Sequence, residues 1–133
     1  MRHGLTRGGL AADAGVNLET VRYYERVGLM PEPDRTSGGH RDYRPEHRQR
    51  LVFIRRAREL GFSLDDIRAL IALSEPGRRT CAEVEPIAAA HLFAVRAKIE
   101  DLRRLEMVLD DAVGRCAGGT APSCPVIEVL GGR

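Results

Sequence analysis

Residues 80–115, TCAEVEPIAAAHLFAVRAKIEDLRRLEMVLDDAVGR, are predicted to form one long helix. The first four have the spacing of a capping box, in which the N-cap and third helical residues bond each other's backbone amides. Apolar residues then recur at three- and four-residue steps, close to a coiled-coil seam: Leu92, Val95, Ile99, Leu102, Leu105 and Leu109. Pro86 lies beyond the first turn, so we expect the helix to begin late or to bend there.

A cysteine stands at each end of this stretch, Cys81 and Cys116. At a helical rise of roughly 1.5 Å per residue they lie about 50 Å apart, too far to share a site within one chain. Two copies of the helix lying antiparallel would bring Cys81 of one chain beside Cys116 of the other. The sequence therefore predicts a homodimer with two thiol sites between its chains.

The residues before the long helix predict a small helical head. Residues 5–14 and 18–27 are helix candidates joined by a short glycine-containing turn, which is the helix-turn-helix pattern. Gly28 fits a left-handed helix cap. The next 15 residues contain two prolines and the Gly38-Gly39 turn signal, so we expect a two-stranded β-hairpin, or wing. Helix-turn-helix followed by such a hairpin is a winged-helix layout.

Two further helices are expected between the wing and the long helix. The first begins at Pro45 and ends near Leu60, and the second begins after the N-cap Ser63 and ends before Pro76. The predicted fold is thus mainly α. Residues 1–75 form the winged head with its following helix pair, residues 80–115 the antiparallel coiled-coil dimerisation helix, and residues 116–133 a loop and tail.

Charge is distributed unevenly along the chain. The first 60 residues hold 12 arginines against 8 acidic residues, whereas the whole chain has a net charge of only +2. A basic front half suggests an anionic partner, although short helices with exposed arginines are common. The sequence has neither a membrane-length apolar run nor a signal peptide, so we expect a cytoplasmic protein without a membrane partner. Three cysteines in that compartment point to metal binding, redox sensing or simple burial.

Three motifs resemble the MerR family of bacterial transcription regulators. VNLETVRYYERVGL (16–29) resembles that family's recognition helix, SGGHRDY (37–43) its wing, and IRRARELGFSL (54–64) its following helix pair. The resemblance implies a dimer that binds palindromic operator DNA, contacts RNA polymerase at the promoter, represses without effector, and activates by distorting the DNA. Residues matching the family's DNA contacts are Thr20, Arg22, Tyr23, Arg35, His40, Arg41 and Tyr43; Tyr24 fits the core as well as a contact.

The third cysteine, Cys124, closes a glycine-rich loop that starts at Cys116. Antiparallel pairing would deliver Cys81 of one chain to both loop cysteines of the other. In the metal-sensing branch that this chain resembles, the ligands match these three positions. Three thiolates suit soft ions. The segments around Cys81 and Cys124 resemble the mercury-resistance regulators most, so Hg(II) is the first candidate. Pb(II), Cd(II) and Zn(II) follow, then Cu(I), whose sensors resemble the loop in length but lack a thiol at Cys81.

Other classes of function remain open at this point. Cys116 and Cys124 could form a disulfide across their loop, which would make a metal-independent redox regulator. The sequence offers no constellation of catalytic residues, so we expect no enzymatic activity.

Overall fold

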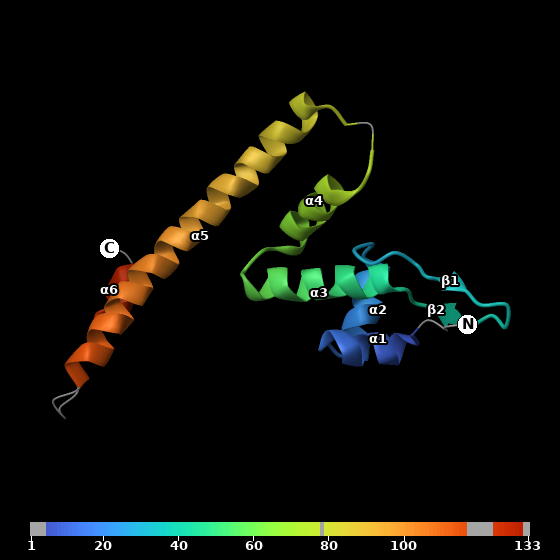
Figure 1. Cartoon of the computed structure of the whole chain (residues 1–133), viewed down its shortest axis with the longest axis horizontal. Helices are drawn as coiled ribbons and strands as arrows, with labels where there is room; N and C mark the ends of the chain where they lie inside the picture. Colours follow the sequence, from blue (N-terminus) through green and yellow to red (C-terminus); the bar gives the residue numbers. More distant parts are fainter. Residues whose placement is uncertain (1–4, 78, 117–123, 132–133) are drawn as a thin grey trace. The chain divides into compact units, whose positions relative to one another are not determined.

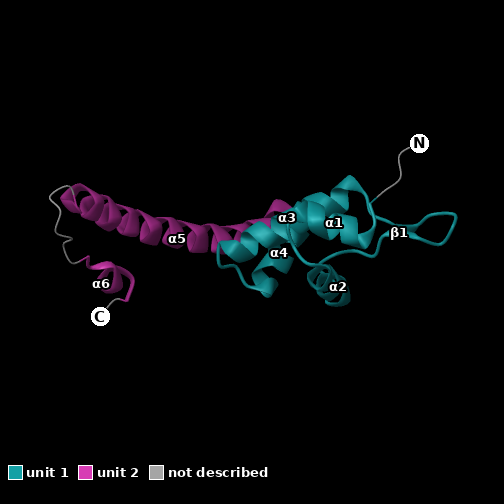
Figure 2. Cartoon of the chain, turned by 90° about the horizontal axis from the view of Figure 1, so that it is seen from below, with its two compact units in different colours: residues 1–76 teal, residues 77–133 magenta. Residues whose placement is uncertain are grey.

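The computed structural model describes residues 5–77, 79–116 and 124–131. The chain divides into two compact units, residues 1–76 and 77–133 (Figure 2). Among the described residues, the first unit contains four helices and a two-stranded hairpin, and the second contains two helices (Figure 1). This mainly helical architecture confirms the predicted fold class, a winged helix-turn-helix head and a long helix.

Helices α1 (Arg7–Ala14) and α2 (Leu18–Arg26) form the helix-turn-helix. The hydroxyl of Thr6 accepts a hydrogen bond from the Gly9 amide, so α1 begins two residues later than predicted. Leu5 instead pairs with Tyr43 in an antiparallel bridge. Asn17 caps α2 by accepting from the Thr20 amide. The side chain of Asn17, the N-cap of α2, therefore closes the turn between the two helices.

The wing consists of β1 (Asp34–Arg35) and β2 (Arg41–Asp42), which pair antiparallel with Arg35 opposite Arg41. The connecting turn contains Gly39 at φ 85°, a left-handed conformation that glycine adopts without steric cost. Gly28 has φ 83°, which confirms the predicted cap after α2.

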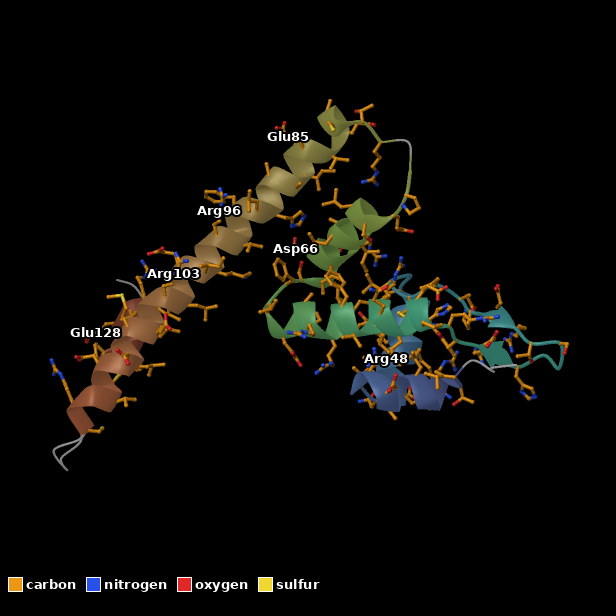
Figure 3. All side chains as sticks on the ribbon, in the orientation of Figure 1. Arg48, Asp66, Glu85, Arg96, Arg103 and Glu128 are labelled. Atoms are coloured by element: carbon orange, nitrogen blue, oxygen red, sulfur yellow. The ribbon has the colours of Figure 1, made fainter. Side chains whose placement is uncertain are left out.

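Helices α3 (Pro45–Glu59) and α4 (Leu64–Ser74) complete the head. Pro45 is in the first turn of α3, and the hydroxyl of Ser63 caps α4, both as predicted. Arg48 of α3 pairs with Asp13 of α1, so a charged contact as well as apolar packing joins these helices (Figure 3). One hydrophobic core lies between the four helices and the base of the wing: Leu10, Ala11, Ala14, Val21, Tyr24, Leu29, Met30, Tyr43, Leu51, Ile54, Ala57, Phe62, Ile67 and Ile71.

Helix α5 (Cys81–Arg115) spans 35 residues, and α6 (Val126–Gly131) packs against it. We expected α5 to begin late or to bend at Pro86; the late start is wrong, since the helix begins at Cys81 and contains Pro86. Proline removes a single backbone hydrogen bond there. The capping box of Thr80 and Glu83 satisfies other amides of the first turn, which holds the helix start at Cys81.

No residue of α5, which the structure describes over its whole length, is buried within the chain. Several large apolar side chains of the predicted seam are exposed, among them Leu92, Ile99, Leu102 and Leu109. Glu85, Arg96 and Arg103 also project from this helix (Figure 3). The short α6 packs against this helix, yet the described structure leaves the seam side chains named above exposed. Among the described residues, no helix is long and apolar enough to cross a bilayer.

Candidate nucleic-acid interface and metal-ligand cysteines

The outer side of α2 carries the candidate DNA contacts of the recognition helix. Arg22 and Tyr23 are exposed, whereas Tyr24 is buried in the core. Thr20 lies in the first turn, where its hydroxyl donates to the side-chain oxygen of Asn17 at 2.9 Å. The hydroxyl oxygen keeps lone pairs free to accept further hydrogen bonds. The α2 cap therefore fixes the position of Thr20 at the exposed start of the helix.

The two larger candidates on α2 are each held by a neighbour on the same helix. Arg22 Nη1 donates to Glu19 Oε2 at 2.8 Å, and both side chains are solvent-exposed. The guanidinium of Arg26 lies 5.5 Å from the centre of the Tyr23 ring. An exposed ion pair of this kind contributes little to stability. Arg22 can therefore exchange Glu19 for a phosphate or a base edge at small cost.

The wing carries the other candidate contacts. Arg35 Nη1 donates to the Gly39 carbonyl at 2.9 Å and closes the hairpin turn. His40 is exposed at the tip, and its amide donates to the Thr36 hydroxyl at 3.2 Å. Arg41 is half-buried, and its Nε has no hydrogen-bond acceptor among the residues that the structure describes. The wing therefore presents two arginines and a histidine close together.

Tyr43 does not belong in the set of direct DNA contacts. Its side chain is only 1 % exposed, and its hydroxyl donates to Glu25 Oε2. Burial, together with that hydrogen bond, raises the pKa of the Tyr43 hydroxyl above its ordinary value. The proposed contact is therefore corrected: Tyr43 fills the core beneath the wing.

Two residues around Tyr43, Arg7 and Glu25, are not singled out by the sequence. Arg7 Nη2 donates to Glu25 Oε1 at 2.8 Å, and Arg7 Nε donates to the Tyr43 hydroxyl oxygen at 3.2 Å. The three positions share no helical or strand spacing, because they come from three different segments. Only the assembled head brings them together.

Two of the three candidate metal-ligand cysteines flank α5. Cys81 is its first residue and is exposed, while Cys116 is its C-cap and is also exposed. The Thr80 amide donates to Glu83 Oε1 at 2.8 Å, and the Glu83 amide donates to the Thr80 hydroxyl at 3.2 Å. The backbone bond from Thr80 lowers the pKa of the Glu83 carboxyl. This closed box fixes the backbone at Cys81.

Cys124 is half-exposed, just before α6, and all three cysteines are free thiols. The loop expected between Cys116 and Cys124 falls at residues 117–123, outside the described residues. Within the part of the chain that the structure describes, no group of three metal-binding side chains comes together. Cys81 thus lies at the first residue of α5 and Cys116 at its C-cap, while Cys124 precedes α6.

Two family models match the chain. The model described as MerR HTH family regulatory protein matches residues 5–73, and the model described as MerR, DNA binding matches residues 48–112. Together they include the helix-turn-helix, the wing, the following helix pair and most of α5.

Relatives of known name match over nearly the full length. A mercuric resistance operon regulatory protein of Bacillus cereus is 42% identical over 92% of this chain and 94% of its own. One from Pseudomonas fluorescens is 44% identical over 96% of this chain and 88% of its own. Among solved structures, the chain is similar to the crystal structure of the transcription regulator PbrR691 from Ralstonia metallidurans CH34 in complex with lead(II), with 40% sequence identity. The match covers 95% of this chain and 98% of that one, with a TM-score of 0.56.

These named relatives are transcription regulators rather than enzymes, and both family models describe regulatory DNA-binding proteins. With its winged helix-turn-helix head and long helix, the chain belongs to the MerR family of DNA-binding transcription regulators.

Proposed function

We propose that this protein is a metal-responsive regulator that represses its promoter without metal and activates it by DNA distortion when a soft metal ion binds. Three parts carry the proposal: a DNA interface on the head, a dimer seam on α5, and a thiol site that two chains complete. The observation that carries it furthest is the position of Cys81 and Cys116 at opposite ends of α5.

The DNA interface comprises α2 and the wing. The exposed side of α2 suits the major groove, and the wing suits the adjacent backbone or minor groove. Arginines supply forked donors for phosphates and bases, while threonine, tyrosine and histidine supply single hydrogen bonds. The proposed contacts are Thr20, Arg22, Tyr23, Arg35, His40 and Arg41.

The dimer follows from the exposed seam of α5. Helices in proteins gain most of their stability from packing of an apolar face, and α5 buries none of its residues within the chain. A second α5 is the partner that matches the seam in length and period. In the antiparallel orientation, Cys81 of each chain comes beside Cys116 and Cys124 of its partner chain. The dimer then has two equivalent sites.

Each site offers three thiol ligands. Soft thiolates favour soft metal ions, and a three-coordinate thiolate set suits Hg(II), Pb(II) and Cd(II) better than Zn(II), which prefers four ligands. Mercuric resistance regulators among the relatives support Hg(II) as the first candidate. The lead(II) complex of the structural relative supports Pb(II) as the second. Cd(II), Zn(II) and Cu(I) follow in that order.

The proposed switch uses sequence-dependent DNA deformability. A dimer with two conformations of different metal affinity is biased by metal toward one of them. If that conformation changes the distance or angle between the two DNA-bound heads, the operator DNA that they hold bends and untwists. RNA polymerase bound at the same promoter can then engage elements that were misaligned before.

A metal titration tests this function. The reduced protein is titrated with Hg(II), Pb(II), Cd(II), Zn(II) and Cu(I), each against an excess of a small thiol. The readouts are thiolate-to-metal ultraviolet absorption and transcription from the protein's own promoter. We expect one Hg(II) per site to survive competition and to activate transcription. Activation by Cu(I) with Cys81→Ser unaffected would contradict the three-thiol site. Activation by an oxidant alone would favour a Cys116–Cys124 redox switch.

A further inference from the structure

Three polar side chains from three segments meet beneath the base of the wing. Arg7 begins α1, Glu25 lies near the end of α2, and Tyr43 directly follows β2. Each member of this trio bonds to both of the others: Arg7 to Glu25 at 2.8 Å, Arg7 to Tyr43 at 3.2 Å, and Tyr43 to Glu25. The side chains of Arg7 and Glu25 are 16 % and 8 % exposed. The network is thus closed and largely sheltered from water.

The wing cannot fix its own orientation. Each of its strands has two residues, and an isolated two-stranded hairpin is at best marginally stable in water. Tyr43 attaches the wing to the head beyond the hairpin's own strand pairing. The backbone of Tyr43 pairs with Leu5 through two hydrogen bonds of 3.0 and 3.2 Å, and its hydroxyl bonds to Glu25 and Arg7. One residue therefore joins the returning strand to both helices of the helix-turn-helix.

The same network joins the two parts of the proposed DNA interface. Glu25 belongs to α2, three residues after the exposed Arg22, and Tyr43 lies two residues after Arg41 of the wing. A hydrogen bond has a preferred direction as well as a length. The bond from Tyr43 to Glu25 therefore constrains how the wing is aimed relative to the recognition helix.

We propose that Tyr43 is a positioning residue for DNA recognition: through Glu25 and Arg7, its hydroxyl holds the wing at the angle from which Arg35 and Arg41 reach the DNA backbone. This inference rests on the wing contacts of the proposed function. It assigns Tyr43 no contact with DNA. Its effect on DNA binding passes entirely through the orientation of the wing.

Removal of the hydroxyl separates positioning from folding. In Tyr43→Phe the ring still fills the core, and the backbone bridge to Leu5 remains. The side-chain link between the wing and α2 is absent in this variant. Binding must then orient a wing that has lost its side-chain link to α2, so its arginines neutralise phosphates less completely. Fewer neutralised phosphates give a shallower dependence of the logarithm of affinity on the logarithm of salt concentration.

The experiment measures DNA affinity of the full chain over a range of salt concentrations, on a duplex selected by the wild-type protein from a random pool. The variants are Tyr43→Phe, Arg41→Gln, the double variant of these two, Arg35→Ala, and Ile54→Val. Ile54 is fully buried in α3 and serves as the matched stability control. We expect Tyr43→Phe and Arg41→Gln each to lower the slope, by about 1 for each phosphate that the wing no longer neutralises. The double variant should lower the slope by less than the sum, and Ile54→Val should keep the wild-type slope.

Two results would overturn the inference while leaving the proposed wing contacts in place. In the first, Tyr43→Phe keeps the wild-type salt slope while Arg41→Gln lowers the slope. The wing would then contact DNA without any help from the Tyr43 hydroxyl. The other is strict additivity in the double variant, because the hydroxyl would then act independently of the wing. If Arg41→Gln and Arg35→Ala both keep the wild-type slope, the proposed wing contacts themselves fail, and the inference fails with them.

Discussion

Cys81 and Cys116 stand at the two ends of one helix: Cys81 is the first residue of α5, and Cys116 is the C-cap that follows its 35 residues. A continuous helix cannot bring its own ends together, since it rises by about 1.5 Å per residue. Any site that uses both thiols must therefore draw them from two chains. This relationship determines the sharpest test of the proposed metal site.

Mixed dimers distinguish a site between chains from a site within one. Homodimers of Cys81→Ser, or of Cys116→Ser, have no complete site and should lose metal induction while they still bind operator DNA. A heterodimer of the two variants pairs the intact Cys81 of one chain with the intact Cys116 and Cys124 of the other. Tandem affinity tags isolate this heterodimer, and we expect it to bind one metal ion at wild-type affinity. Absence of that ion would contradict the shared site.

The seam on α5 predicts the effect of a charge at its centre. Leu102→Lys places an ammonium group in the proposed apolar contact between helices, where a buried charge is strongly unfavourable. We expect light scattering to give the mass of one chain, 14.7 kDa, in place of twice that value. Met107→Lys is the matched control, because Met107 is exposed on α5 but falls outside the seam spacing. Dissociation by both substitutions alike would argue against this seam.

Removal of the capping box should make the start of α5 fray at Cys81. Thr80→Ala removes the N-cap and should cost about 1 kcal/mol of stability at the helix start. Hydrogen exchange of the Glu83 and Val84 amides in the metal-free protein should rise, whereas exchange in the middle of α5 should stay unchanged. Thr80→Ser, which keeps the hydroxyl, is the control. Metal affinity should fall in Thr80→Ala, because Cys81 must then be ordered on binding.

The same box predicts an acid dependence. The pKa of Glu83 is lowered by the bond from the Thr80 backbone, so the ionised carboxylate favours the folded helix start. This contribution is fully present above the ordinary value of 4.5 and is lost as pH falls through the lowered folded value. Exchange at the first turn should therefore rise on acidification below that range. In Glu83→Gln the acid dependence at this turn should be absent.

Tyr43 should titrate at an alkaline extreme. Burial and the bond to Glu25 raise its pKa above the ordinary 10.0, so its neutral form stabilises the head. That stabilisation is present in full below the ordinary value of 10.0 and is lost as pH rises through the folded value. The difference in tyrosinate absorption between wild type and Tyr43→Phe isolates this group. A midpoint of that difference at or below the ordinary value would contradict the buried hydrogen bond.

Arg22 on the recognition helix should affect the base preference of DNA binding, unlike the wing arginines, which should affect its salt dependence. Arg22→Ala removes a charged fork from the exposed side of α2, with little effect on folding, since its partner Glu19 is also exposed. If Arg22 contacts a base, its removal should weaken the free energy of DNA binding by about 1–3 kcal/mol and relax the base preference at one operator position. Quantitative binding to single-base operator variants measures this. Uniform weakening across all variants would instead identify a phosphate contact.

Much of this structure follows from local sequence. Capping residues and glycines locate the ends of most helices, as at Asn17, Ser63 and Gly28, because a cap satisfies backbone groups within a few residues. Gly38-Gly39 places the wing for a similarly local reason. The apolar period places helix α5, but of the two effects expected from Pro86, a late start or a bend, the late start does not occur. The capping box of Thr80 and Glu83 stands at the helix start, before the proline.

What the sequence alone determined is whatever depends on near neighbours in the chain: the helices, the turn residues, and the separation of Cys81 from Cys116 along one helix. What only the tertiary structure decided is which long-range partner each polar side chain meets. Tyr43 follows a basic strand, a position that predicts a DNA contact, yet it is buried against Glu25 and Arg7. Residues 7, 25 and 43 are evenly spaced along the chain, but they belong to three different segments, so no helical or strand period relates them. Their contact arises because packing of the core brings three segments to one point, where a buried hydroxyl must find partners.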